Sequence, residues 1–336
     1  MSVDIRELVP ELHRALLRRQ KQPDWIPPML ATLTEQRFSD PNWIYERKLD
    51  GVRLLGFIRA GRSAKLLTRN KLSANSSYPE VADALAAQDV DMVVDGEVIA
   101  FRGSQTSFEL LQRRMHVIDA SRSRRSSVHV AFVVFDLPHA GGFDCSGLPL
   151  RERKSLLRKL LRTDKTIRLS THRNRDGEKF YEQACRSGWE GLIAKRADST
   201  YQGKRSNDWL KFKCVNEQEM VIVGYTDPKG SRESFGALLL GYRDGGEFRY
   251  GGKVGTGFGR STLADLYQRM RPLERDTPPF ERTKGLPKLG VHWLEPRLVG
   301  QIGFAEWTSD GQLRHPRFLG LREDKTADEV VRERPR

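Results

Sequence analysis

Hydrophobic and polar positions change their spacing along the chain at about residue 215. Before that point, apolar runs typical of strands alternate with stretches in which apolar residues recur at helical spacing. After it, short strand-like runs are separated by glycine-rich turns, and a single stretch has helical spacing. The pattern predicts two domains that meet near residue 215, with an amphipathic segment over residues 1–27 in front of them.

The first domain is expected to be of the α+β class, because strand-like and helix-like segments alternate along it. An Asp50-Gly51 turn between two strand-like runs predicts a β-hairpin. The predicted strands cover residues 43–49, 52–59, 64–68, 92–101 with a break at Gly96, 128–135, 192–195 and 209–213. The predicted helices cover residues 79–88, 107–115 and 178–186, with a strongly basic helix after residue 150.

The second domain has the pattern of a small barrel. Its predicted strands cover residues 220–225, 237–242, 247–253, 294–298 and 302–307, and its predicted helix covers residues 262–270. Five short strands with one helix favour a β-barrel, and the OB-fold is the leading type among basic barrels that bind nucleic acids.

Composition narrows the classes of partner and location. The 336 residues include 58 basic and 44 acidic side chains, a net charge of +14, which attracts nucleic acids and phosphorylated ligands. No apolar run approaches the roughly 20 residues of a membrane span, and no secretory leader is recognisable. Cys145, Cys185 and Cys214 predict neither a disulfide framework nor a thiolate metal site. We therefore expect a soluble protein of a reducing cytoplasm.

Two short windows hold 11 of the 14 surplus charges. Residues 151–173 carry a net charge of +7, and leucines at helical spacing predict that the cations line the solvated face of a helix. A helix that is merely solvated is the alternative interpretation. Residues 113–125 carry a net charge of +4, and the Arg/Ser run over residues 121–127 predicts a loop that follows a phosphate backbone. The DNA-binding candidates are Arg122, Arg124, Arg125, Arg158, Lys159 and Arg162.

Several common sites are excluded by residues that are missing. Gly203-Lys204 and Gly252-Lys253 lack the earlier glycine and the following Ser or Thr of a P-loop. The segment over residues 255–259 lacks the third glycine of a dinucleotide fingerprint. The seven histidines have no metal-ligand spacing, and the chain has no Gly-x-Ser-x-Gly elbow.

A candidate nucleophile stands at the predicted hairpin, where Lys48 ends one strand and Arg53 opens the next. A lysine amine is nucleophilic when it is partly deprotonated, a state that desolvation and nearby cations favour. Arg53, Lys211 and Lys213 are expected to supply those cations. The alternative is an ordinary lysine of a surface hairpin.

Other charged residues alternate along predicted strands. Asp95-Gly96-Glu97 and Lys211-Phe212-Lys213 each place two like charges on one face, and Glu190 precedes the strand over residues 192–195. One amine with several carboxylates and cations suits transfer of a phosphoryl-type group beside a divalent metal, for which Mg²⁺ is typical. Surface hairpins with alternating charges are again the alternative.

Taken in chain order, these residues resemble the motif set of the covalent nucleotidyltransferases, specifically the ATP-dependent DNA ligases. The matching elements are Lys48-x-Asp50-Gly51-x-Arg53, Thr68-Arg69-Asn70, Asp95-Gly96-Glu97, Phe135-Asp136, Glu190-Gly191, Lys211-Phe212-Lys213 and Arg322-Glu323-Asp324-Lys325. Each element alone is common, whereas the ordered set is specific. The stretches over residues 252–258 and 313–322 are similar to the ligase module of bacterial ligase D, an end-joining type.

The resemblance implies an α+β nucleotidyltransferase domain over residues 28–215, with ATP-grasp-like antiparallel sheets and helices, and an OB-fold barrel over residues 216–330. It implies that Lys48 attacks the α-phosphorus of ATP, releases pyrophosphate and carries AMP. The AMP then passes to a DNA 5′-phosphate, and the 3′-hydroxyl seals the strand. A divalent metal, Mg²⁺ or Mn²⁺, and a hinge over residues 214–217 are also implied.

The resemblance further implies a role for each matched residue. The residues implied to bind AMP are Glu46 and Phe135 at adenine, Arg53 and Glu97 at ribose, and Arg69, Lys211 and Lys213 at phosphate. The implied metal ligands are Glu190, Asp95 and Glu97. The implied catalytic set adds Asp50 beside the nucleophile, and Arg322, Asp324 and Lys325 at the pyrophosphate.

The expected partner is nicked or broken duplex DNA, and the end-joining resemblance adds a Ku-type end-binding protein by association. We expect a monomer at the bacterial nucleoid, with no membrane contact. Two alternatives stay open at this point, one another kind of enzyme and one a protein without catalytic activity. They are an RNA ligase or a GTP-dependent capping-type nucleotidyltransferase, and a catalytically silent protein that binds DNA ends.

Overall fold

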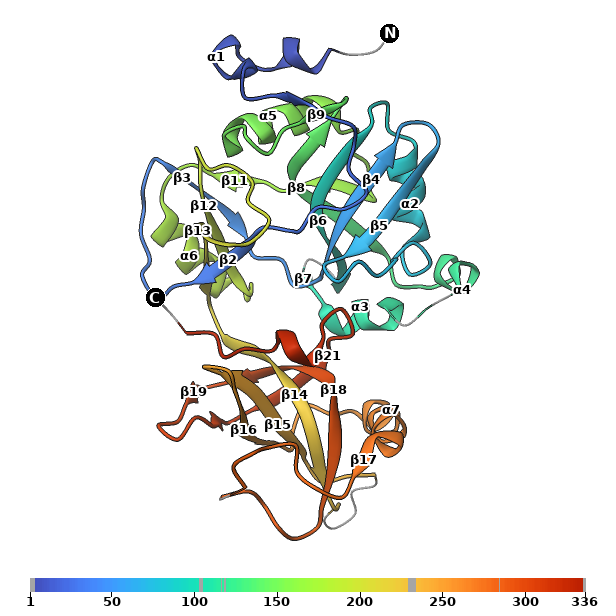
Figure 1. Cartoon of the computed structure of the whole chain (residues 1–336), viewed down its shortest axis with the longest axis vertical. Helices are drawn as coiled ribbons and strands as arrows, with labels where there is room; N and C mark the ends of the chain where they lie inside the picture. The colour runs from blue at the N-terminus through green and yellow to red at the C-terminus, as the bar shows by residue number, and fades with distance from the viewer. Residues whose placement is uncertain are drawn as a thin grey trace. The chain divides into compact units, whose positions relative to one another are not determined.

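The computed structural model describes residues 4–102, 105–115, 117, 119–228, 234–283 and 285–334. The chain divides into two compact units, which are drawn in Figure 1. Unit 1 runs to Cys214, and unit 2 covers Val215–Glu333. Each unit has its own cluster of buried hydrophobic side chains.

Unit 1 contains a large, mainly antiparallel sheet of eight strands. The strand order is β1 (Arg18–Arg19), β9 (Phe143–Asp144), β8 (Val130–Ala140), β6 (Met92–Arg102), β4 (Val52–Arg59) and β5 (Ser63–Thr68). Two further strands join it, β7 (Gln105–Thr106) on β6 and β10 (Ile167–Leu169) parallel to β8. The expected break at Gly96 is a β-bulge within the continuous strand β6, so the pairing with β8 goes on beyond it.

A second sheet of five strands completes unit 1. Its order is β11 (His172–Arg173), β3 (Trp43–Arg47), β12 (Gly191–Arg196), β13 (Arg205–Lys213) and β2 (Leu30–Leu33). The helical segments of this unit are η1 (Ile5–Leu8), α1 (Glu11–Arg14), α2 (Pro79–Ala86), α3 (Phe108–Met115), α4 (Ala120–Arg124), α5 (Leu150–Leu160) and α6 (Gly177–Arg186).

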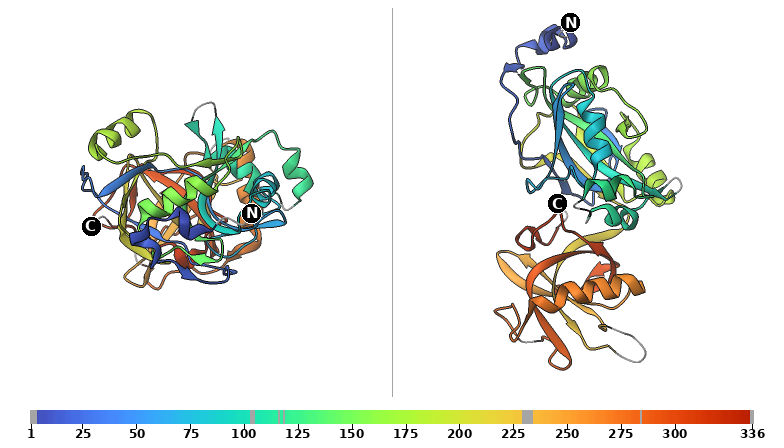
Figure 2. Two further views of the ribbon diagram at one scale, coloured as in Figure 1. Left: turned by 90° about the horizontal axis from the view of Figure 1, so that it is seen from above. Right: turned by 90° about the vertical axis from the view of Figure 1, so that its right-hand side faces the viewer.

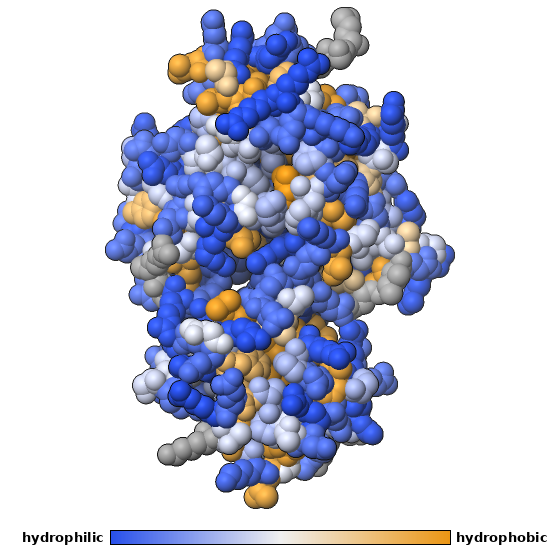
Figure 3. Space-filling model, viewed as in Figure 1, coloured by the Kyte–Doolittle hydropathy of each residue, from blue (hydrophilic) through white to orange (hydrophobic). Residues whose placement is uncertain are grey.

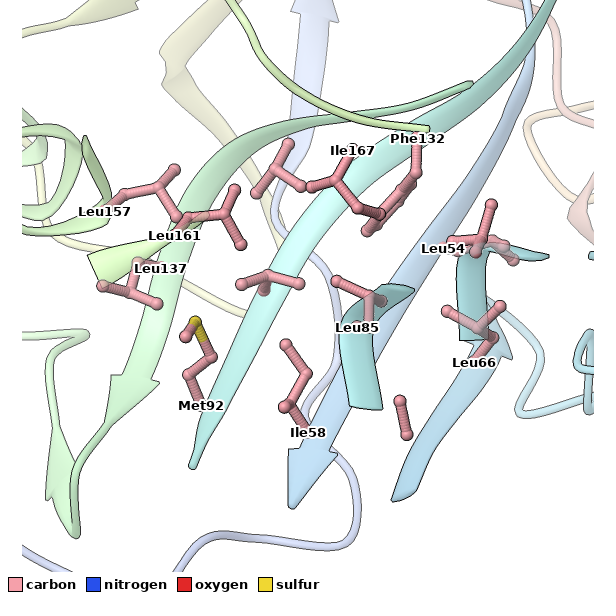
Figure 4. Close-up of a cluster of buried hydrophobic side chains, with 14 of the residues drawn as sticks. Leu54, Ile58, Leu66, Leu85, Met92, Phe132, Leu137, Leu157, Leu161 and Ile167 are labelled. Carbon is pink, nitrogen blue, oxygen red and sulfur yellow. The ribbon is translucent and has the colours of Figure 1, made fainter. Parts of the chain in front are cut away.

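The main core of unit 1 lies between the eight-stranded sheet and two helices, α2 against β4 and β5, and α5 against β8. The helices can be followed against the strands in Figure 2. Figure 4 shows part of this core, in which the labelled side chains are Leu54, Ile58, Leu66, Leu85, Met92, Phe132, Leu137, Leu157, Leu161 and Ile167. Burial of this apolar surface is the main source of stability of the sheet.

The predicted hairpin at Asp50-Gly51 is wrong, because β3 and β4 belong to different sheets. β3 pairs with β11 and β12, whereas β4 pairs with β5 and β6. Residues 48–51 therefore carry the chain from one sheet to the other. Gly51 permits this crossing, because a Cβ there would lie 2.1 Å from the backbone oxygen of Val98.

The two basic windows also differ from expectation. The Arg/Ser run is a short helix, α4, which Asp119 caps by accepting a hydrogen bond from the Ser121 N–H. His116 and Ile118 of this window lie outside the described residues. In the second window the helix ends at Leu160, and Arg153 and Lys154 are buried. Both cations point inward because each forms an ion pair with a buried carboxylate, Arg153 with Asp136 and Lys154 with Glu46.

The interpretation of the cysteines is wrong as well. Cys185 and Cys214 form a disulfide that joins α6 to the residue after β13. Two widely spaced cysteines gave no sign of this, because α6 and β13 meet only in the folded sheet. Cys145 is a buried free thiol, and burial raises its pKa to about 12.

Unit 2 is built on a six-stranded antiparallel sheet. Its order is β16 (Glu247–Val254), β15 (Leu238–Asp244), β14 (Asn216–Thr226), β18 (Val291–Phe304) and β17 (Glu274–Arg275), with β21 (Arg317–Leu321) on β18. The remaining elements are β19 (Glu306–Trp307), β20 (Leu313–Arg314), α7 (Arg260–Met270), η2 (Arg271–Leu273) and η3 (Ala327–Glu329). The two strands expected over residues 294–307 are largely one, β18, because Gly300 continues its pairing with β14.

Hydrophilic residues dominate the face of the molecule drawn in Figure 3. Among the described residues, no helix is long and apolar enough to cross a membrane.

Candidate active site

A cavity of about 140 Å³ lies in unit 1 between the two sheets. The five-stranded sheet and the segment after β3 supply Ala31, Glu46, Arg47, Lys48, Leu49, Ile193, Lys195 and Trp209, and the eight-stranded sheet supplies Arg53, Glu97 and Phe135, with Ser170 between β10 and β11. A cavity of about 150 Å³ takes up an aromatic ring. The space therefore fits a planar base better than a whole nucleotide.

Lys48 is held at this cavity by a carboxylate. Its Nζ donates a hydrogen bond to Glu190 Oε1, and its backbone N–H donates to the Gly191 carbonyl at 2.9 Å. Burial alone would lower the pKa of Lys48, but Glu190, with Asp50 and Glu97, outweighs it and raises the pKa above its ordinary value. The expectation that cations keep this amine neutral is therefore wrong for the protein without substrate.

Gly191 brings Glu190 to Lys48 by a close approach of two backbones. Its φ is +147°, and a Cβ would lie 1.9 Å from the carbonyl oxygen of Phe212. No other residue fits there without moving β12 away from β13. The glycine is thus required by strand packing, and the carboxylate before it is carried to Lys48 as a result.

Strand register places Lys211 and Lys213 on the cavity face of the five-stranded sheet. Ile193 pairs with both Glu46 and Lys211, and Gly191 pairs with Lys213. Neighbouring residues in register share a face, and Glu46 and Ile193 both line the cavity. Between the two lysines, Phe212 faces the opposite side, where it is fully buried.

The carboxylates of β6 divide into two roles. The register puts Glu97 opposite Arg53 and Asp95 opposite Leu55, so both lie on one face of the sheet, as expected. Asp95 is fully buried and accepts two hydrogen bonds from Arg53, at 2.9 and 2.6 Å, and one from the Tyr201 hydroxyl at 2.6 Å. These three donors tie Asp95 to Arg53 and Tyr201, and its assignment as a metal ligand stays a prediction. Tyr201 was not expected at the site.

Glu46 is buried between two ammonium groups, and neither was predicted from the sequence to contact it. Lys154 Nζ lies 2.6 Å from Oε1, and Lys195 Nζ lies 3.1 Å from Oε2, which also accepts from Ser170. Burial alone would raise the pKa of Glu46, but the two lysines outweigh it and lower the pKa to about 2. Burial lowers the pKa of Lys195 to about 8, with Lys154 acting in the same direction and Glu46 against it.

Aromatic rings from both sheets form a wall of the cavity. Phe135 and Trp209 meet edge to face, with ring centroids 6.1 Å apart. Lys195 Nζ lies 4.2 Å from the Phe135 centroid and 4.1 Å from that of Trp209, while the Arg53 guanidinium also faces both rings. Trp209 and Lys195 were missed as site residues. Their alternation with Ile193 and Lys211 on paired strands was the available signal.

The last sequence element forms its own cluster in unit 2, directly after β21. Arg322 donates two hydrogen bonds to Asp324, at 2.9 and 2.8 Å, and Lys325 Nζ is bonded to Glu219 of β14. Burial alone would raise the pKa of Asp324, but Arg322 lowers it. In unit 1, Arg69 directly follows β5 and does not line the cavity.

Comparison with protein families assigns both units. Residues 28–213 match the model described as the ATP dependent DNA ligase domain, and residues 231–325 match the ATP dependent DNA ligase C terminal region. The chain belongs to the ATP-dependent DNA ligase family. The expected α+β fold, a nucleotidyltransferase domain followed by an OB-fold domain, is thereby confirmed together with the resemblance.

Among individual relatives of this ligase chain are end-joining proteins. It is 39% identical over 93% of its length to the multifunctional non-homologous end joining protein LigD of Pseudomonas aeruginosa, and 36% identical over 92% to the corresponding DNA repair protein of Mycobacterium tuberculosis. It covers 37% and 40% of those two proteins. A solved structure of a mycobacterial DNA ligase D complexed with ATP and MES matches with a TM-score of 0.65, at 33% identity, over 92% of this chain and 98% of that one.

The DNA-binding candidates lie on or next to α4 and α5. Arg122, Arg124 and Arg125 are exposed, as are Arg158, Lys159 and Arg162. Some of them have local partners: Arg124 pairs with Asp83, Arg162 pairs with Asp89, and Lys159 donates to the Leu8 carbonyl. These surface contacts are weak and leave the cations available to a polyanion.

Proposed function

We propose that the chain is an ATP-dependent DNA ligase that seals breaks in duplex DNA through an AMP group carried on Lys48. The observation that supports this most is a lysine bonded to a carboxylate at the mouth of an aromatic-walled cavity, in a chain of the ligase family. In the first step the Lys48 nitrogen forms a bond to the α-phosphorus of ATP. The bond from that phosphorus to the pyrophosphate oxygen breaks, and the amine loses its proton.

The loss of that proton needs a group beside Lys48. The hydrogen bond to Glu190 supports this carboxylate as the first acceptor, because a protonated amine has no lone pair for attack. In the second step a DNA 5′-phosphate displaces the lysine nitrogen from AMP. In the third, the 3′-hydroxyl displaces AMP, which leaves a phosphodiester bond.

Adenine would occupy the cavity beside the rings of Phe135 and Trp209, which meet edge to face, with Glu46 at its edge. Glu46 stays ionised, since its pKa is about 2, and can accept a hydrogen bond from the amino group of adenine. Arg53 and Glu97, on the opposite sheet, would hold the ribose. Lys211 and Lys213, on the face of Glu46, would contact the α-phosphate, and Arg69 is proposed for the phosphate side.

The described residues hold no group of three or more His, Cys, Asp or Glu side chains able to bind a metal ion. Magnesium sites of enzymes that bind nucleotides often use one or two carboxylates with the phosphates of the substrate. Glu190, Glu97 and Asp95 are the proposed carboxylates here, and Asp95 also accepts hydrogen bonds from Arg53. The metal, Mg²⁺ or Mn²⁺, would neutralise phosphate charge.

Arg322, Asp324 and Lys325 would orient the pyrophosphate when unit 2 closes. The residues over 214–217 are the proposed hinge, since unit 1 ends at Cys214. Asp324 fixes the Arg322 side chain by accepting hydrogen bonds from it. This supports a guanidinium that is already oriented before the pyrophosphate binds.

Repair of broken DNA in a bacterial nucleoid, with a Ku-type partner, is the proposed setting. The chain spans about two fifths of the curated end-joining relatives, and their names refer to non-homologous end joining. The proposed role of the chain in end joining rests on its similarity to this part of those relatives.

The test is sealing of a labelled nicked duplex with ATP and Mg²⁺, with a duplex bearing broken ends in parallel. We expect sealing by the natural chain and none by Lys48→Ala, which should also fail to become labelled by α-labelled ATP. Labelling by GTP alone would favour a capping-type enzyme. Sealing of nicked RNA but not DNA would favour an RNA ligase, and binding of ends without sealing would favour a silent end-binding protein.

A further inference from the structure

A second and larger cavity, of about 600 Å³, lies in unit 1 and shares no lining residue with the candidate active site. It is formed by α2, α3, α4, the ends of β6 and β8, and the segment that enters β10. The lining residues that bear on its chemistry are Glu80, Phe101, Arg114, Arg124, Lys165 and Arg168.

The floor of this cavity contains buried donors without partners. Arg114 is 1% exposed; its Nη groups donate to the carbonyls of Val128 and Ser77 and to Glu80. Within the described part of the chain, its Nε and the Oγ of Ser123 are buried and have no hydrogen-bond partner. A buried donor that is left unpaired destabilises the fold, so donors in a cavity wall favour an acceptor from outside.

The rim adds positive charge that is not fully balanced. Lys165 and Arg168 are exposed, and in the described residues neither pairs with a carboxylate; Arg168 Nε donates at 3.4 Å to the Lys165 carbonyl. Arg124 is paired with Asp83. Glu80 is the only carboxylate among the described lining residues, and with Asp83 beside Arg124 the four cations Arg114, Arg124, Lys165 and Arg168 leave a surplus of +2.

Part of the lining beside these cations is apolar. Val130, Ala131 and Phe101 contribute to it, and the Arg168 guanidinium lies over the Phe101 ring, 5.0 Å from its centroid. A flat ring beside a guanidinium is a surface on which nucleic-acid bases stack. Free phosphate would use the cations alone, whereas a nucleotide would use both the charged rim and the apolar part of the lining.

We propose that this cavity binds one nucleotide of a DNA strand, with its phosphate at Lys165 and Arg168 and its base or sugar against Phe101. The proposal rests on the proposed ligase function and adds a DNA contact away from the ATP site.

The test compares two double variants of equal charge. Lys165→Ala with Arg168→Ala removes the rim, and Arg62→Ala with Lys65→Ala removes two exposed cations next to or on β5, outside both cavities. All four positions are exposed, and circular dichroism melting checks that both variants fold. Affinity for a nicked duplex is measured by fluorescence anisotropy from low to moderate salt.

We expect the rim variant to lose affinity at low salt, with a slope of log affinity against log salt that is smaller by about 2. The control variant should lose at most half as much affinity as the rim variant, and its slope should change by at most half as much. Labelling of Lys48 by ATP should be unchanged in both. Equal losses in the two variants would overturn the cavity as a DNA site, whereas failure of the natural chain to label or to seal would instead refute the proposed function.

A second arm separates DNA from free nucleotide. The ring signal of His129, which lines the cavity and is assigned with His129→Gln, is followed by nuclear magnetic resonance during titration with the nicked duplex and with dCMP. A shift with the duplex, lost in the rim variant, supports the proposal. A shift with dCMP alone would make the cavity a free-nucleotide site, and no shift with either would refute binding there.

Discussion

At the scale of single residues, the resting protein holds its candidate nucleophile in the wrong protonation state for attack. Glu190 and its neighbours raise the pKa of Lys48, so the amine is an ammonium near neutral pH. The same carboxylate keeps the side chain at the cavity. Orientation and reactivity are therefore separated, and reactivity must come with substrate.

Glu190→Gln should move the pH dependence of Lys48 labelling. Removal of the negative charge lowers the pKa of Lys48, so the half-maximal rate is expected at a lower pH than in the natural chain. The maximal rate should fall by at least tenfold, because the proposed metal carboxylate is lost. The measurement is the initial rate of adduct formation from labelled ATP between pH 6 and about 10, where the rate of the natural chain should still be rising at the upper end. The same pH profile in both proteins would refute control of the amine by Glu190.

Glu46→Gln should destabilise unit 1 in a way that depends on pH. The change leaves Lys154 and Lys195 without their carboxylate, and removal of one partner from a buried ion pair costs about 3–5 kcal/mol. In the natural chain the folded pKa of Glu46 is about 2 against 4.5 for the free group, so its stabilisation is complete above pH 4.5 and is lost as pH falls toward 2.

The difference in unfolding free energy between the two proteins should thus be largest above pH 4.5 and shrink below it. Urea unfolding at pH 7, 4 and 3 measures it. A difference that stays constant over this range would show that Glu46 contributes through packing alone. Ser170→Ala is a suitable control, because it removes a hydrogen bond to Glu46 without changing charge.

At the scale of elements, the sequence predicts strands and helices well where one face is continuously apolar. The strand over 128–135 and the helix over 178–186 both appear, as β8 and α6. Pairing is a different matter, because it depends on long-range contacts. The Asp50-Gly51 turn has the local chemistry of a hairpin, yet β3 and β4 each find better partners elsewhere.

The same limit explains which site residues sequence reasoning found. Lys48, Glu97 and Phe135 stand in short motifs and do line one cavity. Lys154 lies on a helix whose spacing predicts a solvated position, and Tyr201 stands in no motif. Both reach the site through buried hydrogen bonds or ion pairs to carboxylates, which no local pattern reports.

The Cys185–Cys214 bond gives a prediction at this scale. It closes a loop of 29 residues, for which chain entropy gives about 3.5 kcal/mol of stabilisation. Cys185→Ser with Cys214→Ser should therefore lower the unfolding free energy of unit 1 by up to this amount. Denaturant unfolding measures the loss, and Cys145→Ser serves as a control for removal of a thiol. Alkylation of Cys185 or Cys214 in the native, unreduced protein would contradict the bond.

At the scale of the whole molecule, the basic residues behind the net charge of +14 have different roles. Arg153 and Lys154, counted at first among the solvated cations, neutralise buried carboxylates. Arg158, Lys159 and Arg162 stay on the surface. Net charge alone therefore overstates what is available to DNA, and burial decides which cations count.

Neutralising Arg158, Lys159 and Arg162 to Ala together should weaken binding of nicked DNA. If all three contact phosphates, the slope of log affinity against log salt falls by up to about 3. Labelling of Lys48 should be spared, because these residues lie outside the candidate active site. Anisotropy titrations over a salt series measure the slope. An affinity that does not change at any salt would return α5 to a merely solvated surface.

The position of the cavity between the two sheets of unit 1 has a consequence for the thermal stability of the purified protein. The cavity takes its walls from both sheets, and the chain crosses between them at residues 48–51. An AMP group attached there would fasten one sheet to the other. Purified material would then contain a loaded and an empty species with separate melting temperatures, and the ratio of the two transitions would read out nucleotide occupancy before any assay. Incubation with pyrophosphate should convert the higher transition into the lower one.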